Sequence, residues 1–214
     1  MTDRPLQPRD GPVPPRLMLQ YLIVLAGTAP LVWRRIRVPA AYSFWDLHVA
    51  IQDAMGWLDC HLHQFRVADP RSGTVLTLGL PDPDVSDERG LVPDWTEFPL
   101  DYAAGDSPPI QYTYDFGDDW QHSVIFEGFE QASGRRRPRP ECLDGAGACP
   151  PEDSGGSHGY AELLLALADA DHPQHTEYME WTGGPIDPTS FSAASVRFDD
   201  PRERWRIAFE DGAN

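Results

Sequence analysis

The chain has 214 residues, of which 41% are hydrophobic and 11% aromatic; this composition is typical of a globular protein and excludes a disordered one. Its formal net charge of −17 argues against the phosphate neutralisation that drives sequence-independent nucleic-acid binding. No run of about 18 apolar residues is present, so no membrane-spanning helix is expected. The N-terminus holds acids and prolines where a signal peptide needs an apolar core, which predicts a cytoplasmic protein.

Composition divides the chain into three parts. We expect a disordered Pro-rich tail over residues 1–16, a single domain over 17–198 and a polar C-terminal tail over 199–214. At the start of the domain, apolar residues over 17–26 and 31–38 predict two strands of a hairpin, joined by a Gly-Thr-Ala-Pro turn.

The segment 44–55 has the strongest helical pattern of the chain. Ser43 is placed as its N-cap and Asp46 lies at the capping-box position. Apolar residues recur at helical spacing on one face, and Gly56 is the expected stop. We expect this helix to lie on the sheet that the first hairpin forms.

The middle of the chain predicts further hairpins. Strands are expected at 61–69 and 74–78, followed by an acidic loop over 80–109 with one short element near 94–102. Strands at 110–116 and 120–127 form a second hairpin around a two-residue turn, Gly117-Asp118.

The remaining elements are a long loop and two helices. The loop covers 131–158, the helices cover 159–169 and 172–182 with Asp171 as cap of the second, and 187–198 holds one helical turn and an extended piece. Strands that follow one another as hairpins predict an α+β fold. We expect a roll of β-hairpins forming a mostly antiparallel or mixed sheet, with helices packed on one face.

Four spaced segments carry a family resemblance. They are Trp33 to Pro39; Phe44 to His48 with Gly56-Trp57 and His61 to Phe65; Tyr114 to His122; and Cys149 to Gly156 with Gly159-Tyr160. In this order they resemble the plasmid Ri-A4b open-reading-frame-three-like family, whose relatives include TnpR-type passenger proteins of an insertion element. The resemblance covers about residues 17–195 and implies a compact α+β roll carried on plasmids, mobile elements and chromosomes. It implies no particular reaction.

One position departs from the family pattern. The family often has Cys where this chain has Ser154, which weakens a thiolate metal site formed by Cys142 and Cys149 with Asp153 or His158. The alternative is that both thiols are small loop residues. The helix that follows could hold an anion at its N-terminus, but Glu152 and Asp153 would repel a phosphate there unless a cation intervened.

Two pairs of residues suggest a metal site. His61 and His63 are two apart on a predicted strand, so both side chains are expected on one face. With Gly117-Asp118 as the turn, Asp115 faces Trp120 and lies diagonal to His122. The four residues His61, His63, Asp115 and His122 would form a nitrogen and oxygen site for a divalent metal such as zinc. The alternative is ordinary strand packing and turn chemistry, with Asp118 and Asp119 satisfying turn amides.

Basic residues gather in two places despite the acidic total. Arg34, Arg35 and Arg37 form one group, and Arg135, Arg136, Arg137 and Arg139 form another. Either could meet an anionic partner, and a solvated strand face is the alternative for the first. Three function classes stay open: an accessory protein that binds a protein partner through its acidic surface, a metal-dependent hydrolase or similar enzyme, and a nucleic-acid accessory protein that uses the Arg groups.

Overall fold

The computed structural model describes residues 13–81, 90–104, 106–134 and 136–210. Its strands are β1 (Leu17–Leu25), β2 (Trp33–Pro39), β3 (His63–Ala68), β4 (Val75–Gly79), β5 (Leu91–Pro93), β6 (Ile110–Tyr114), β7 (Trp120–Gln131) and β8 (Glu141–Ala146). Its α-helices are α1 (Phe44–Met55), α2 (Gly156–Ala168), α3 (His175–Thr182) and α4 (Pro201–Trp205). Short helical turns are η1 (Asp94–Thr96), η2 (Pro99–Tyr102), η3 (Ala193–Ser195) and η4 (Arg206–Glu210).

The strands form one sheet in the order β5-β4-β3-β6-β7-β1-β2-β8. Neighbouring strands pair antiparallel except β4 and β5, which pair parallel. The two expected hairpins, β1–β2 and β6–β7, lie next to each other because β1 also pairs with β7. The predicted α+β class with a mixed, mostly antiparallel sheet is confirmed. No helix among the described residues is long and apolar enough to cross a bilayer.

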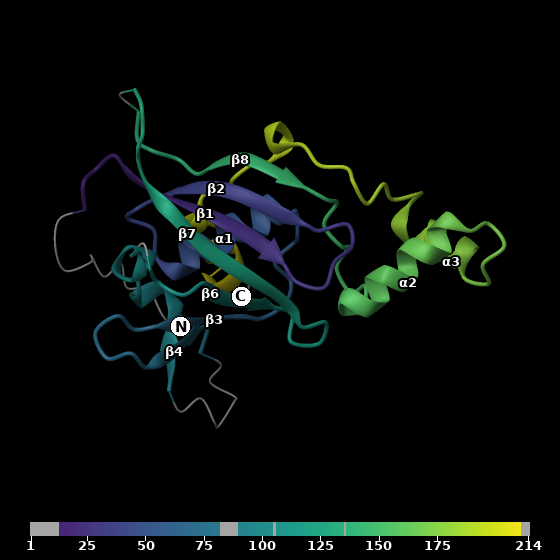
Figure 1. The fold of residues 1–214 in the computed structure, drawn as a ribbon, viewed down its shortest axis with the longest axis horizontal. Coiled ribbons are helices and arrows are strands. Elements are labelled where there is room, and N and C mark those ends of the chain that lie inside the picture. The colour runs from purple at the N-terminus through teal and green to yellow at the C-terminus, as the bar shows by residue number, and fades with distance from the viewer. Residues whose placement is uncertain (1–12, 82–89, 105, 135, 211–214) are drawn as a thin grey trace.

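Helix α1 packs its length against the sheet and closes the core (Figure 1). The expected caps form: Ser43 and Asp46 make a reciprocal capping box, and Gly56 ends the helix at φ 101°. The core beneath it is aromatic, since Tyr112, Tyr114 and Trp120 are almost fully enclosed. A rigid aromatic layer of this kind fixes the positions of the loops at its rim.

The C-terminal segment belongs to the domain, so the expected tail over 199–214 is wrong as far as Glu210. Trp205 in α4 is enclosed, and its ring lies 5.1 Å from the rings of both Trp45 and Trp95. Arg204 pairs with Asp53 at 2.8 Å and with Asp59 at 3.3 Å. These contacts fasten α4 to α1 and to the loop that follows α1.

Two further elements differ from expectation. The loop expected over 131–158 contains β8, which pairs with the edge of β2. Helix α3 begins at His175, three residues later than expected, and Gln174 rather than Asp171 occupies its N-cap without a capping side chain. Helices α2 and α3 form a pair beyond the β1–β2 turn, at the end of the sheet (Figure 1).

Candidate functional site

The tip of the β6–β7 hairpin has a wider loop than the sequence predicts. Tyr114 pairs with Trp120, so residues 115–119 make the connection and the two-residue turn is wrong. Asp115 and Asp119 adopt left-handed backbone angles, with φ of 53° and 54°. The Asp115 Oδ1 atom accepts hydrogen bonds from the amides of Gly117 (2.8 Å) and Asp118 (3.3 Å). Asp tolerates this conformation because its side chain satisfies nearby amides, which stabilises the wider loop.

This turn leaves the second carboxylate oxygen of Asp115 directed at His61. The Oδ2 atom lies 3.6 Å from His61 Nε2. Strand β3 begins only at His63, so His61 precedes the strand and the expected alternation does not apply to it. His61 and His63 therefore enter different surroundings, and the prediction that they share one face is wrong.

A third segment reaches the same place from far along the chain. The loop over 149–155 brings Asp153 Oδ1 to 3.1 Å from His61 Nε2. Asp153 is also left-handed, at φ 57°. Two non-glycine residues with positive φ facing one imidazole are uncommon, and such strain gathers at functional sites.

Several contacts hold this loop against the hairpin. The Gly155 amide donates to Asp118 Oδ2 at 3.0 Å, and the Leu58 amide donates to Glu152 Oε1 at 2.7 Å. The Tyr114 hydroxyl donates to the same carboxylate at 3.1 Å. Gly156 has φ 68°, and a Cβ added there would lie 2.5 Å from the Asp118 carbonyl oxygen. Only glycine fits that approach, so the junction is specified by the sequence.

We name His61, Asp115 and Asp153 the His61 cluster. Their ligand atoms all lie within 4.8 Å of one another. Although both carboxylates are near, His61 Nε2 is enclosed and has no hydrogen-bond partner among the described residues. The side chains are exposed to 28%, 10% and 72% for His61, Asp115 and Asp153, so the cluster opens to solvent on the Asp153 side. A second group of Cys60, His61 and Glu152 adjoins it.

His63 and His122 do not reach this cluster. His63 lies in the core, where its Nε2 atom is 2.8 Å from Asp94 Oδ2 and its ring stacks on His48 at 3.5 Å. His122 is opposite Tyr112 in the sheet and its Nδ1 atom donates to the Trp120 carbonyl. Burial lowers the pKa of His122 to about 4. The expected convergence of four ligands and the expected Asp115–His122 pair are therefore wrong; His61 and Asp115 do meet.

Four other candidate residues contribute no ligand atom to the His61 cluster: Asp118, Asp119, Cys142 and Cys149. Asp118 fastens Gly155, and Asp119 Oδ2 accepts from the Gln121 amide at 2.8 Å. Cys142 lies on β8, and Cys149 packs against the core, where burial raises the pKa of its thiol. Neither thiol joins a potential metal group within the described part of the chain. Of the Cys-loop candidates, Asp153 and Glu152 therefore lie at the site and the two cysteines do not.

Arg34, Arg35 and Arg37 do not form one basic patch on β2, because adjacent strand residues point to opposite faces. Arg34 is 1% exposed and donates to the carbonyl groups of Ala54, Ala146 and Gly147. Arg35 lies on the other face and pairs with Glu127 at 2.8 Å. Arg37 is on that second face as well, 3.9 Å from a carboxylate oxygen of Glu141. Of the second group, Arg135 falls outside the described residues; Arg136, Arg137 and Arg139 are exposed.

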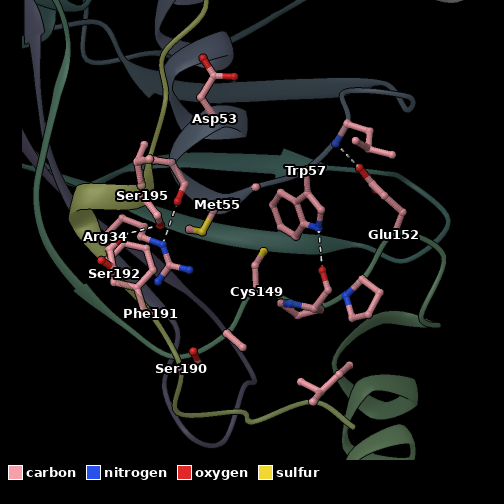
Figure 2. A pocket seen from close by; sticks show the side chains of 18 of the residues that line it. Arg34, Asp53, Met55, Trp57, Cys149, Glu152, Ser190, Phe191, Ser192 and Ser195 are labelled. Atoms are coloured by element: carbon pink, nitrogen blue, oxygen red, sulfur yellow. Dashed lines mark hydrogen bonds between the residues drawn. The ribbon is translucent and has the colours of Figure 1, made fainter. Parts of the chain in front are cut away.

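A cleft of about 820 Å³ adjoins the cluster. It lies between the end of α1, the loop over 149–152 and the segment over 186–197. Figure 2 shows Arg34 and Phe191 at one side of this cleft, Trp57 in the middle and Glu152 at the other side. Glu152 also belongs to the group around His61, so the cleft and the cluster share a wall. The sequence alone offered no signal for this cleft, because its walls come from distant segments.

Comparison with known proteins places this architecture in a family. The family model described as plasmid pRiA4b ORF-3-like protein matches residues 18–195. The uncharacterized protein y4hQ of Sinorhizobium fredii is 35% identical over 200 residues, which cover 88% of this chain and 94% of that protein. The crystal structure of MM3350, a protein of unknown function from Methanosarcina mazei Go1, superposes with a TM-score of 0.78 at 36% identity. That match covers 86% of this chain and 99% of the other. The chain therefore belongs to the plasmid pRiA4b ORF-3-like family.

Proposed function

We propose that the protein binds a divalent metal ion at the His61 cluster. The observation that supports this proposal is that His61 Nε2 is buried without a hydrogen bond, although oxygens of Asp153 and Asp115 lie 3.1 Å and 3.6 Å away. An ion held between the three ligand atoms would satisfy that nitrogen and both carboxylates at once. One imidazole with two carboxylates is a ligand set that suits Zn²⁺ or Mn²⁺.

The charge around the cluster favours a cation. Asp115 and Asp153 carry the ligand oxygens, and Glu152 and Asp118 lie beside them. Among the described residues, no Arg pairs with any of these four carboxylates. Four acids without an arginine partner repel one another, and a bound divalent cation lowers that repulsion.

The arrangement also fits metal-assisted hydrolysis. Three protein ligands leave coordination positions for water and substrate, and a bound divalent ion lowers the pKa of water. The exposed side of Asp153 gives access to solvent, and the cleft of about 820 Å³ has room for a small organic substrate. Metal binding is the primary proposal, and hydrolysis is its extension.

The test is metal analysis of protein purified without a metal-chelating column, followed by titration of the metal-free protein with Zn²⁺ and Mn²⁺. We expect about one ion per chain and a higher melting temperature when the ion is bound. Asp115→Asn and Asp153→Asn should each weaken binding about ten-fold or more, because Asn accepts the left-handed backbone but removes a charged ligand. His61→Gln should do the same.

Asp119→Asn is the matched control. Asp119 lies in the same loop at φ 54°, and its carboxylate points to Gln121 rather than to His61. This variant changes the net charge by the same amount and should leave the affinity within about two-fold. Equal losses in Asp119→Asn and Asp115→Asn, or no metal uptake by the wild-type protein, would rule the proposal out. Hydrolysis of a panel of ester, amide and phosphoester substrates, compared with His61→Gln, tests the extension.

A further inference from the structure

The segment between Arg139 and Arg197 has an extreme charge pattern. Residues 140–196 contain no Arg and no Lys, and they contain ten acidic residues. This stretch includes the whole pair of helices α2 and α3. A groove formed by this segment therefore has no Arg or Lys of the segment in its walls, and its electrostatic potential is negative.

Such a groove of about 480 Å³ runs between the two helices. Helix α2 and the residue before it contribute Gly155, Gly159 and Leu163, while α3 contributes Glu177, Tyr178 and Trp181. Asp153 and Ser154 close one end. Gly159 allows a tight turn at the start of α2, since a Cβ there would collide with the Ser154 carbonyl oxygen.

The aromatic side chains of this groove are incompletely packed. Helix α3 has no buried residue, and Trp181 is 48% exposed. The rings of Tyr178 and Trp181 lie 6.2 Å apart at 51°, so they form a corner rather than a stack. A guanidinium group binds favourably to an exposed indole face beside a carboxylate, because the ring attracts the cation and the carboxylate pairs with it.

Ser154 supplies an independent sign of a ligand. Its side-chain oxygen is enclosed, the residue is only 9% exposed, and no hydrogen-bond partner is present among the described residues. Buried hydroxyl groups in folded proteins normally find a partner. A donor entering the groove would satisfy this oxygen, whereas an anion would meet Asp153 and Glu177.

We propose that the α2–α3 groove binds an arginine side chain presented by an exposed basic segment of a partner protein. The guanidinium lies over the Trp181 ring, pairs with Glu177 and donates toward Ser154. A second copy of this chain fits less well, because two molecules of charge −17 repel each other. The cluster of exposed arginines Arg136, Arg137 and Arg139 lies in the β7–β8 connection, at the opposite end of the molecule from α2 and α3 (Figure 1).

The groove stands apart from the metal proposal. Glu177, Tyr178 and Trp181 are outside the His61 cluster, and only Asp153 lines both. Binding should therefore persist in the presence of a chelator. Loss of metal binding with intact peptide binding would overturn only the first proposal, and the reverse result only the second.

The probe is the synthetic peptide Gly-Ser-Arg-Gly-Arg-Ser-Gly, with a matched peptide in which citrulline replaces both arginines. Affinity is measured by calorimetry, and the indole N–H signal of Trp181 is followed by NMR. We expect the arginine peptide to shift that signal and the citrulline peptide to bind at least about ten-fold more weakly. Trp181→Leu and Glu177→Gln should each weaken binding about five-fold or more.

Glu180→Gln is the control, since Glu180 is an exposed acid of the same helix that does not line the groove. It should change the affinity by less than about two-fold. Equal binding of the citrulline peptide, or equal losses in Glu180→Gln and Glu177→Gln, would show attraction to acidic surface in general and overturn the proposal. Circular dichroism of Trp181→Leu separates misfolding from lost contact, and Glu177→Gln keeps the test valid if that variant misfolds.

Discussion

Arg34 and Arg35 are neighbours on β2, but their different surroundings give them very different contributions to the free energy of unfolding. Three hydrogen bonds of Arg34 end on carbonyl groups from α1, from β8 and from the residue after β8. The ring of Phe191 covers its guanidinium at 3.7 Å. One side chain therefore joins the end of α1 to the edge of the sheet and to the segment over 186–197. Because α1 directs its negative dipole end at this cation, the charge is partly compensated without a carboxylate.

The structure predicts losses of stability of very different size when these two charges are removed. Arg34→Met should lower the free energy of unfolding by about 3 kcal/mol or more, because four buried or partly buried carbonyl groups lose a donor. Arg35→Met should lower it by less than about 1 kcal/mol, since its pair with Glu127 is solvent-exposed. Chemical denaturation of both variants measures the difference. Similar losses in the two would contradict the role assigned to Arg34.

The same residues show what a sequence can predict. Period-two alternation in β2 places Arg34 and Arg35 on opposite faces, so the separation of this pair could have been foreseen. The left-handed angles of Asp115 and Asp153 could not, because Asp in a loop is compatible with several turn types. The partnership of Asp153 with His61 depends on a loop closed over some ninety positions. No local pattern specifies such a contact.

At the scale of elements, sequence patterns identified the helices and strands that are stabilised by interactions within the element. The capping box of α1 formed as predicted because Ser43 and Asp46 satisfy each other's amides within one turn. Strand β8 was missed because its sequence, ECLDGA, has low β propensity and depends on pairing with β2. Helix α4 was missed because a five-residue helix has little stability alone, and its order comes from packing on α1.

That dependence leads to a prediction for α4. Trp205→Ala should lower the free energy of unfolding by about 3 kcal/mol or more, because an enclosed indole loses its contacts with Trp45 and Trp95. Ile207→Ala is the control in the next turn, where the side chain is 56% exposed and the loss should stay below about 1 kcal/mol. Urea unfolding followed by circular dichroism measures both. A Trp205→Ala variant as stable as Ile207→Ala would show that α4 is dispensable.

At the scale of the whole molecule, two electrostatic effects oppose each other as pH falls. Lowering the pH toward the isoelectric point near 4.6 reduces the self-repulsion of a chain with net charge −17, which favours the folded state. Burial also raises the pKa of Asp53 to about 6, so stability is gained as that carboxyl takes up a proton. Two enclosed imidazoles act in the other direction. Burial lowers the pKa of His48, which also stacks on His63, and the pKa of His122 to about 4.

A native pKa below the unfolded value means that the unfolded chain takes up the proton first. The contribution of His122 to stability is therefore complete above about pH 6.5 and is lost as pH falls toward about 4. Between about pH 7.5 and about pH 5, this one residue should remove about 2 kcal/mol from the free energy of unfolding. His122→Gln lowers stability at neutral pH but should flatten the pH dependence by that amount.

His158→Gln is the control; its side chain is 87% exposed, and the substitution should leave the slope unchanged. Urea unfolding over this pH range distinguishes the two, because a packing defect alone shifts the curve without changing its slope. Identical slopes in the wild-type protein and His122→Gln would show that the enclosed imidazole does not set the acid limit of the fold.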